Sequence, residues 1–135
     1  MRSFTSGWRR VARPLVAMSA IAIATAWAAS VMAADIPPAA MNEAKQIFST
    51  RCSPCHGAQG KGDGAAAAGL TPKPRNFSDP EWQKSVTDDH IEKIIKLGGA
   101  AVGKSPLMPG NPDLASKDDV VKGLRATIRG LAAKN

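Results

Sequence analysis

Cys52-Ser53-Pro54-Cys55-His56 is the segment on which the interpretation of this 135-residue chain depends. Two cysteines separated by two residues and followed at once by histidine form the attachment pattern of c-type haem. In that pattern each thiol bonds to a vinyl group of one porphyrin, and the adjacent imidazole ligates the iron. We therefore predict one covalently bound haem per chain, attached through Cys52 and Cys55, with His56 as an iron ligand.

Three other interpretations of the same residues are weaker. A structural zinc site needs about four protein ligands, but the chain has no third cysteine and its only other histidine is His90. A thioredoxin-like redox pair belongs to a βαβ pattern, and no convincing strand lies near Cys52. A plain disulfide across so short a loop would stabilise little, because the closed loop is tiny.

The first third of the chain has the composition of an export signal. Residues 1–14 contain four arginines and no acidic residue, and residues 15–32 form an almost uninterrupted apolar run. The run ends in Val31-Met32-Ala33, so we expect cleavage after Ala33 or Ala34 and a signal peptide over residues 1–33. The alternative is a retained membrane anchor, although the run is near the lower length limit for a span.

Export places the remaining domain, residues 34–135, in the periplasm. Arg9-Arg10 invites a twin-arginine interpretation, but the flanking residues do not support it. Haem attachment after export also requires a chain that is still open enough to admit haem. The general secretory route, which exports unfolded chains, is therefore favoured, and no stable membrane insertion is expected after cleavage.

The high positive charge is largely a property of the signal segment. The whole chain has a formal charge of +7, but residues 1–33 hold four of the eighteen basic residues and none of the eleven acidic ones. The fourteen basic and eleven acidic residues that remain leave +3, and two haem propionates would lower this to about +1. No basic run with interleaved aromatics is present, so nucleic acid binding is not expected.

About a hundred residues remain after cleavage, enough for one small domain. Its aromatic side chains are Phe48, Phe77 and Trp82. A domain of this size buries a modest fraction of its surface and is marginally stable alone. A large apolar cofactor would supply the missing core, so we expect the haem-free chain to be mostly unfolded.

The periodicity of the domain is helical throughout. Apolar residues recur on one face of residues 38–48, a short helix is expected over 80–85, and Thr87 is a suitable N-cap for a helix over 88–97 that ends at Gly98-Gly99. Ile91, Ile94 and Ile95 form the expected buried face of this helix, and His90 is expected at the surface. A final amphipathic helix follows the segment Ser116-Lys117-Asp118-Asp119, which is expected to cap it.

Two features of the final helix suggest how it packs. Gly123 would weaken the helix in isolation, so we expect another helix, the first one, to approach closely there. Lys122, Arg125 and Arg129 lie opposite the apolar stripe. We interpret this basic stripe as a solvated face, with partner docking as the alternative.

The segment after His56 is rich in glycine and then in proline. Four glycines within residues 57–64 would let the backbone fold tightly against a flat ligand, and a helical turn is expected over 65–68. The segment lacks the strand and the Lys-Ser/Thr ending of a phosphate-binding loop. A backbone carbonyl within 65–74 should accept the Nδ1 proton of His56. Arg75 and Asn76 are candidates to bind a haem propionate, or are solvated surface residues.

Residues 103–112 form a proline-stiffened loop with Met108 near its middle. A thioether can fill the second axial position of a low-spin haem, which raises the reduction potential. Pro106 and Pro109 restrict the loop and so lower the entropic cost of holding the sulfur. The alternative for a methionine is a core side chain, and Met41 is the rival candidate, but it faces the helix-packing side. We predict His56 and Met108 as the axial ligands.

These residues together resemble the class I c-type cytochromes. The likeness rests on the motif at Cys52–His56, on Phe48 one turn upstream and on Met108-Pro109 before a last amphipathic helix, and it covers nearly all of residues 39–133. It implies an all-α cytochrome c fold, with three to five helices around one haem and with the N- and C-terminal helices crossing. The chain departs from many relatives in offering Ile128 rather than an aromatic at that crossing.

The resemblance also implies a role in moving one electron between larger redox partners. With both axial positions filled there is no open site for a substrate, so an enzyme is not expected. Lys61, Lys73 and Lys104 are candidates to steer acidic partners. Two alternatives stay open: a dedicated haem subunit of an oxidase or dehydrogenase complex, and a haem sensor in which Met108 leaves the iron. The chain is accordingly expected to be a monomer or a subunit of a redox complex.

Overall fold

The structure is a computed structural model that describes residues 36–132. The predicted signal peptide and its cleavage site lie outside the described residues. The α-helices of the described part are α1 (Pro38–Ile47), α2 (Ser53–His56), α3 (Pro80–Ser85), α4 (Asp88–Leu97) and α5 (Asp118–Gly130). No strand occurs within residues 36–132, which confirms the predicted all-α class.

α1 and α2 form one helical stretch that carries the attachment motif. A π-helical turn, Phe48–Cys52, joins them, and Pro38 occupies the first turn, where proline is tolerated. The stretch ends after His56 because Gly57 adopts a φ of +81°, which helical residues with a side chain rarely reach. Both cysteines and His56 are thus held on helical backbone that is continuous with α1.

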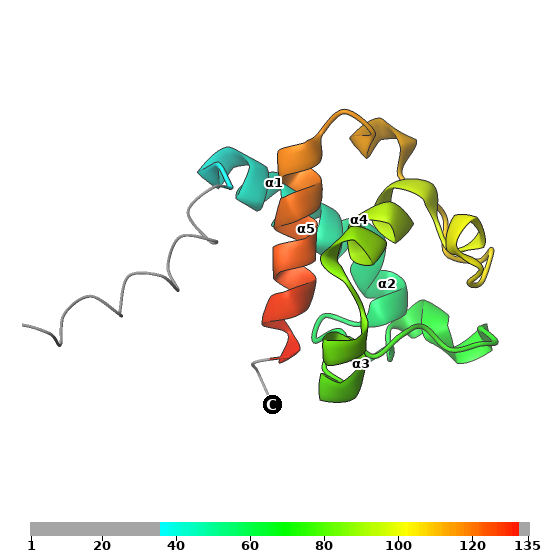
Figure 1. Cartoon of the computed structure of the whole chain (residues 1–135). Helices are drawn as coiled ribbons and strands as arrows, with labels where there is room; N and C mark the ends of the chain where they lie inside the picture. The colour runs from blue at the N-terminus through cyan, green and yellow to red at the C-terminus, as the bar shows by residue number, and fades with distance from the viewer. Residues whose placement is uncertain (1–35, 133–135) are drawn as a thin grey trace, which may run out of the picture. The chain divides into compact units, whose positions relative to one another are not determined.

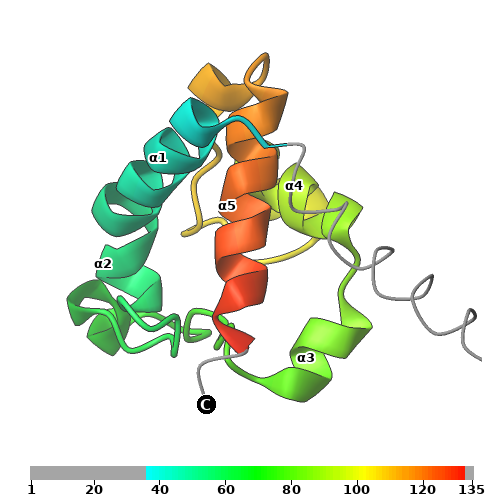
Figure 2. The same ribbon diagram turned by 90° about the vertical axis from the view of Figure 1, so that its left-hand side faces the viewer.

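α1 crosses α5 at Gly123, as the sequence predicts. A Cβ atom built on Gly123 would lie 2.8 Å from the Cβ of Ala44 and 3.4 Å from the Ala40 carbonyl oxygen, both in α1. Figures 1 and 2 show the two helices side by side in views turned by 90°. Glycine at this position therefore lets the two backbones approach more closely than any other residue would.

α4 begins and ends where its sequence signals predict. The Thr87 side chain accepts a hydrogen bond from the His90 backbone N–H, and Gly98 ends the helix with a φ of +82°. Ile91 and Ile95 are buried, whereas Ile94 is half-buried. His90 is half-buried too, rather than fully at the surface, because it lies one turn before Ile94 on the same helix face.

The predicted cap of α5 is wrong. The residue before the helix is Lys117, and no side chain caps the helix. Lys117 instead donates a 2.7 Å hydrogen bond to Glu43 of α1, and Lys96 of α4 donates one of 2.6 Å to Asp118. Pairing with neighbouring helices has taken the place of local capping.

One core joins the elements. Its buried members come mainly from α1, α4 and α5, and Phe77 from a loop and Leu114 from the short 3-10 helix Pro112–Leu114 complete it. Phe48 is among them, as expected for a core residue, and Trp82 of α3 packs against the cluster while remaining half-buried. The core therefore lies between α5 and the helices on either side of it (Figure 2).

Candidate functional site

His56 is buried, with 8 % of its surface exposed. Its Nδ1 atom lies 3.1 Å from the backbone oxygen of Arg75. A carbonyl can only accept, so Nδ1 carries the proton and Nε2 keeps its lone pair. Burial lowers the pKa of His56, and the hydrogen bond to Arg75 opposes this in part. The imidazole is thus neutral and presents Nε2 as a possible metal ligand.

The carbonyl that orients His56 lies one residue beyond the predicted range of 65–74. The difference follows from the path of the glycine loop. Gly62, with a φ of +77°, packs directly against the Pro74 carbonyl, which leaves the next carbonyl, that of Arg75, to face the imidazole.

An aromatic ring fixes the plane of the imidazole. Phe77 stacks on His56 with ring centroids 4.3 Å apart and an angle of 15° between the planes. Trp82 in turn lies against Phe77, with ring centroids 5.4 Å apart and an angle of 32° between the planes. His56 is therefore held at Nδ1 by a hydrogen bond and on one face by a buried side chain, and neither contact uses Nε2.

Both motif cysteines are free thiols and half-buried. Burial raises the pKa of Cys52 to about 11, although the neighbouring Arg51 charge acts in the opposite direction. The Cys52 sulfur therefore keeps its proton at neutral pH and is a poor thiolate ligand. No cluster of three or more His, Cys, Asp or Glu side chains that could hold a metal ion is found in the described range.

The loop that carries Met108 is anchored to the end of α4. The Met108 carbonyl accepts a 2.9 Å hydrogen bond from the Gly99 N–H, and a Cβ on Gly98 would lie 2.6 Å from the Gly110 nitrogen. Asn111 donates from its backbone to Lys96 and from its side chain to Ile95. Met108 itself is half-buried. The loop backbone is thus held at the Met108 carbonyl itself and again at Asn111, three residues further on.

One ion pair joins the attachment segment to this loop. Arg51, the residue before Cys52, contacts both carboxylate oxygens of Asp113 at 2.9 and 3.0 Å. The same guanidinium donates to the Asn111 side chain at 3.3 Å. The two segments that carry the predicted haem-binding residues are therefore connected directly, across about sixty residues of sequence.

The residues present fit a haem group. They offer two thiols at the attachment spacing, an imidazole whose Nε2 is not engaged by its orienting contacts, and a thioether on an anchored loop. Leu97, at the end of α4, and Leu107, next to Met108 in the sequence, are large apolar side chains that are 58 % and 57 % exposed.

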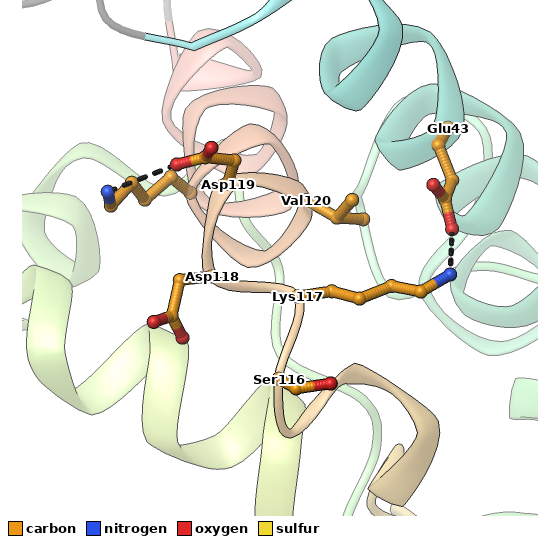
Figure 3. A pocket seen from close by; sticks show the side chains of 7 residues that line it. Glu43, Ser116, Lys117, Asp118, Asp119 and Val120 are labelled. Carbon is orange, nitrogen blue, oxygen red and sulfur yellow. Dashed lines mark hydrogen bonds and ion pairs between the residues drawn. The ribbon is translucent and has the colours of Figure 1, made fainter.

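A separate hollow at the start of α5 does not suit a porphyrin. Figure 3 shows it lined by charged and polar side chains, with Lys117 paired to Glu43 and Lys122 paired to Asp119. Neither the motif cysteines nor His56 line it. We therefore assign the haem site to the attachment motif rather than to this hollow.

The comparison with known families agrees with this assignment. The Cytochrome c family profile matches residues 41–122, a range that includes the attachment motif and Met108. The chain belongs to the cytochrome c family. No curated protein matches it closely enough to serve as a relative. Membership implies covalently bound haem c, which fits Cys52, Cys55 and His56, and it implies redox partners in general, since proteins of this family generally transfer electrons.

The remaining predicted site residues of this cytochrome c are exposed. The Arg75 guanidinium makes no hydrogen bond or ion pair with any residue in the described range, whereas the Asn76 side-chain oxygen accepts from the Ser78 N–H and hydroxyl. Their binding of a propionate remains a prediction. Lys73 donates to the carbonyls of Ala67 and Ala68 at 2.8 Å each, so this amine is already engaged.

Sequence reasoning missed the bonded state of Arg125 and Arg129. Arg125 and Arg129 are half-buried and bonded, so the interpretation of the basic stripe of α5 as a solvated face is wrong for them. Their partners lie in α3 and α4, which periodicity within α5 could not reveal. No helix between residues 36 and 132 is long and apolar enough to cross a membrane.

Proposed function

We propose that this cytochrome c is an exported one-electron carrier whose haem is attached through Cys52 and Cys55 and ligated by His56 and Met108. Bound haem would supply an iron centre that takes up and releases one electron. The observation that carries the proposal is the state of His56. A buried, neutral imidazole, held at Nδ1 by Arg75 and stacked on Phe77, presents Nε2 for ligation.

Met108 is proposed as the second ligand. Its loop is fastened to the end of α4 at Gly99 and Asn111, and to the attachment segment through Arg51. Such anchoring lowers the entropy that would be lost on ligation. A second protein ligand leaves no open coordination position for a substrate, which favours a carrier over an enzyme.

The location and partners are also part of the proposal. The arginine-rich start, the apolar run and the cleavage site near Ala33 support export to the periplasm by the general secretory route. There the carrier would meet its donor and its acceptor. Lys61 and Lys104 are exposed and remain candidates for steering acidic partners. Mass spectrometry of the protein from a periplasmic extract checks the cleavage site and the addition of one haem.

The optical spectrum of the purified ferric protein tests the ligation. Methionine ligation produces a weak red band from thioether sulfur to ferric iron, which we expect in the wild-type protein. Met108→Ala should abolish the band, and Met41→Ala should retain it as a matched control. A wild-type spectrum without the band, or a Met108→Ala spectrum that keeps it, would contradict the proposed ligand.

A further inference from the structure

We propose that Gln83 and Arg129 are positioning residues for the His56 imidazole. They hold the segment 75–77, which supplies both contacts that orient the ring. This inference rests on the proposed function, because it assumes that His56 ligates the haem. It adds residues from α3 and α5 whose side chains do not touch the attachment motif.

The segment 75–77 acts on His56 twice. The Arg75 carbonyl accepts the Nδ1 proton, and the Phe77 ring stacks on the imidazole. Both residues precede α3 and belong to no helix, so helical hydrogen bonds do not fix them. The Phe77 N–H donates to the Gly60 carbonyl at 2.6 Å, which secures one side of the segment. The Phe77 carbonyl, on the other side of the segment, needs a different hydrogen-bond donor.

Gln83 supplies that group. Its Nε2 atom donates to the Phe77 carbonyl at 2.7 Å and to the Ile128 carbonyl at 3.0 Å. One amide thus joins the orienting segment to the last turn of α5, where the Ile128 carbonyl also accepts from the Leu131 N–H at 3.2 Å. The side-chain oxygen of the same amide accepts from Arg129 at 2.9 Å. This contact fixes which end of the amide faces Phe77.

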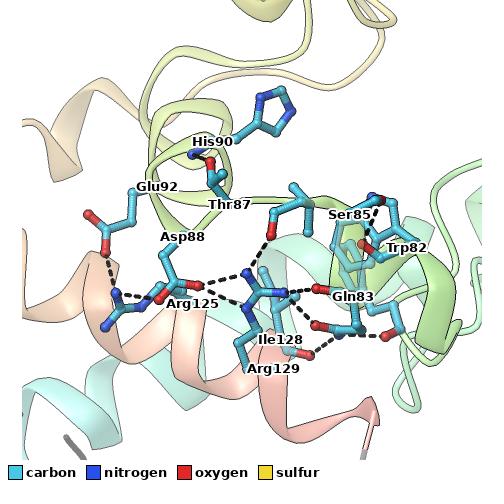
Figure 4. A network of polar contacts seen from close by, with 12 residues as sticks. Trp82, Gln83, Ser85, Thr87, Asp88, His90, Glu92, Arg125, Ile128 and Arg129 are labelled. Atoms are coloured by element: carbon cyan, nitrogen blue, oxygen red, sulfur yellow. Dashed lines mark hydrogen bonds and ion pairs between the residues drawn. The ribbon is translucent and has the colours of Figure 1, made fainter.

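Arg129 binds both the backbone and the side chain of Gln83. Besides the amide oxygen, its Nη1 atom contacts the Gln83 carbonyl at 2.6 Å, and Nη2 donates to the Val86 carbonyl at 2.8 Å. Asp88 accepts from Nε and Nη2 at 2.9 and 2.7 Å. Figure 4 shows the guanidinium between α5 and the junction of α3 and α4. A planar fork with five donors is suited to this arrangement, whereas an ammonium group is not.

The consequence is a continuous path of contacts from α5 to the imidazole. Arg129 orients Gln83, Gln83 holds Phe77, and Phe77 with Arg75 orients His56. The hydrogen bond at Nδ1 raises the basicity of a ligating histidine, so its geometry affects the reduction potential. Loss of the Gln83 donor should therefore weaken this hydrogen bond and raise the potential.

Gln83→Glu in the holoprotein tests the inference. Glutamate keeps the oxygen that Arg129 contacts but loses the donor to Phe77 and Ile128. We expect the His56 Nδ1 proton, followed by NMR, to exchange with solvent at least tenfold faster. The equilibrium constant against a reference redox couple should change about threefold, equivalent to about 28 mV at about 59 mV per tenfold for one electron. Arg129→Lys, which keeps the charge but not the fork, should shift both readouts in the same direction.

Arg125→Ala is the matched control. Arg125 lies one turn before Arg129 and bonds Asp88 at 2.9 Å and Glu92 at 3.3 Å, without contacting Gln83 or Phe77. We expect it to lower stability while leaving proton exchange and potential at the wild-type values. Equal shifts in Arg125→Ala and Gln83→Glu would overturn the inference, because general loosening would then explain both.

The wild-type spectrum separates failure of the inference from failure of the proposed function. If the His56 ring protons show no hyperfine shift in the ferric wild-type protein, the ligation is wrong and the inference falls with it. If they are shifted but neither Gln83→Glu nor Arg129→Lys changes the exchange or the potential, the inference alone is overturned. Faster exchange and a raised potential in both variants would support it.

Discussion

Gly123→Ala tests the crossing of α1 and α5, which sets the position of the helix that leads to the attachment motif. The new Cβ would lie 2.8 Å from the Ala44 Cβ, 3.4 Å from the Ala40 oxygen and 3.6 Å from the Met41 Cα. Ala44 is fully buried, and its methyl group has no rotamer through which to move away. The two backbones must therefore separate to accommodate the added carbon.

Two opposing effects decide how Gly123→Ala changes the free energy of unfolding. Overpacking a tight core contact costs about 1–3 kcal/mol. Replacing glycine within a helix recovers about 0.8–1.0 kcal/mol of helix propensity. We expect the steric cost to exceed the gain because the contact is with immobile atoms. The net loss of about 1 kcal/mol corresponds to a fall in melting temperature of about 4–8 °C for a domain of this size.

Gly130→Ala is the matched control in the same helix. A Cβ at Gly130 meets nothing within 4 Å, so this change should be neutral or stabilising. Urea unfolding of each holoprotein, followed by far-ultraviolet circular dichroism, gives the two free energies. A double variant that also carries Ala44→Gly should lose less stability than the single changes together predict. A Gly123→Ala protein as stable as Gly130→Ala would refute the steric argument.

Three further predictions concern ion pairs and the cofactor. Arg51→Ala removes the half-exposed ion pair with Asp113 and should lower the free energy of unfolding, measured with urea, by about 0–1 kcal/mol, and by less at high salt. Lys84→Ala removes a more exposed ion pair and should lower it by less. Lys96 lowers the pKa of Asp118 below its ordinary 3.8 through a hydrogen bond and its charge. The resulting stabilisation of the folded state is present above the ordinary carboxyl pKa and is lost as the pH falls through the lowered pKa of Asp118. Lys96→Met should therefore raise the Asp118 pKa in an NMR titration and make the free energy of unfolding less dependent on acid pH. Replacing both attachment cysteines by alanine should leave a mostly unfolded chain with no cooperative thermal transition by circular dichroism.

The ends of α3 and α4 could be predicted because they depend on residues that are close together in the sequence. Pro80 starts α3, while Thr87 and Gly98 bound α4, because capping and a positive φ involve residues within a few positions of each other. The same reasoning failed at the start of α5. There Lys117 pairs with Glu43, which is 74 residues away, and such a partner leaves no trace in the local pattern.

The candidate site also has a part that could be predicted from adjacent residues and a part that depends on residues far apart in the sequence. The attachment motif could be recognised because its chemistry requires adjacent residues, and the family match supports it. The carbonyl that orients His56 could not be identified, since it depends on how the glycine loop packs against Pro74. The helical pattern of α5 assigned Arg129 to the polar face but could not show that Gln83 and Asp88 cover it.

Exposure of the reduced protein to carbon monoxide at neutral pH tests the central claim most directly. A carrier with His56 and Met108 both bound to iron should keep its optical spectrum, because no coordination position is open. Met108→Ala should bind carbon monoxide under the same conditions and so serves as the positive control. Rapid binding by the wild-type protein would contradict the account and favour a sensor or an enzyme with a displaceable ligand.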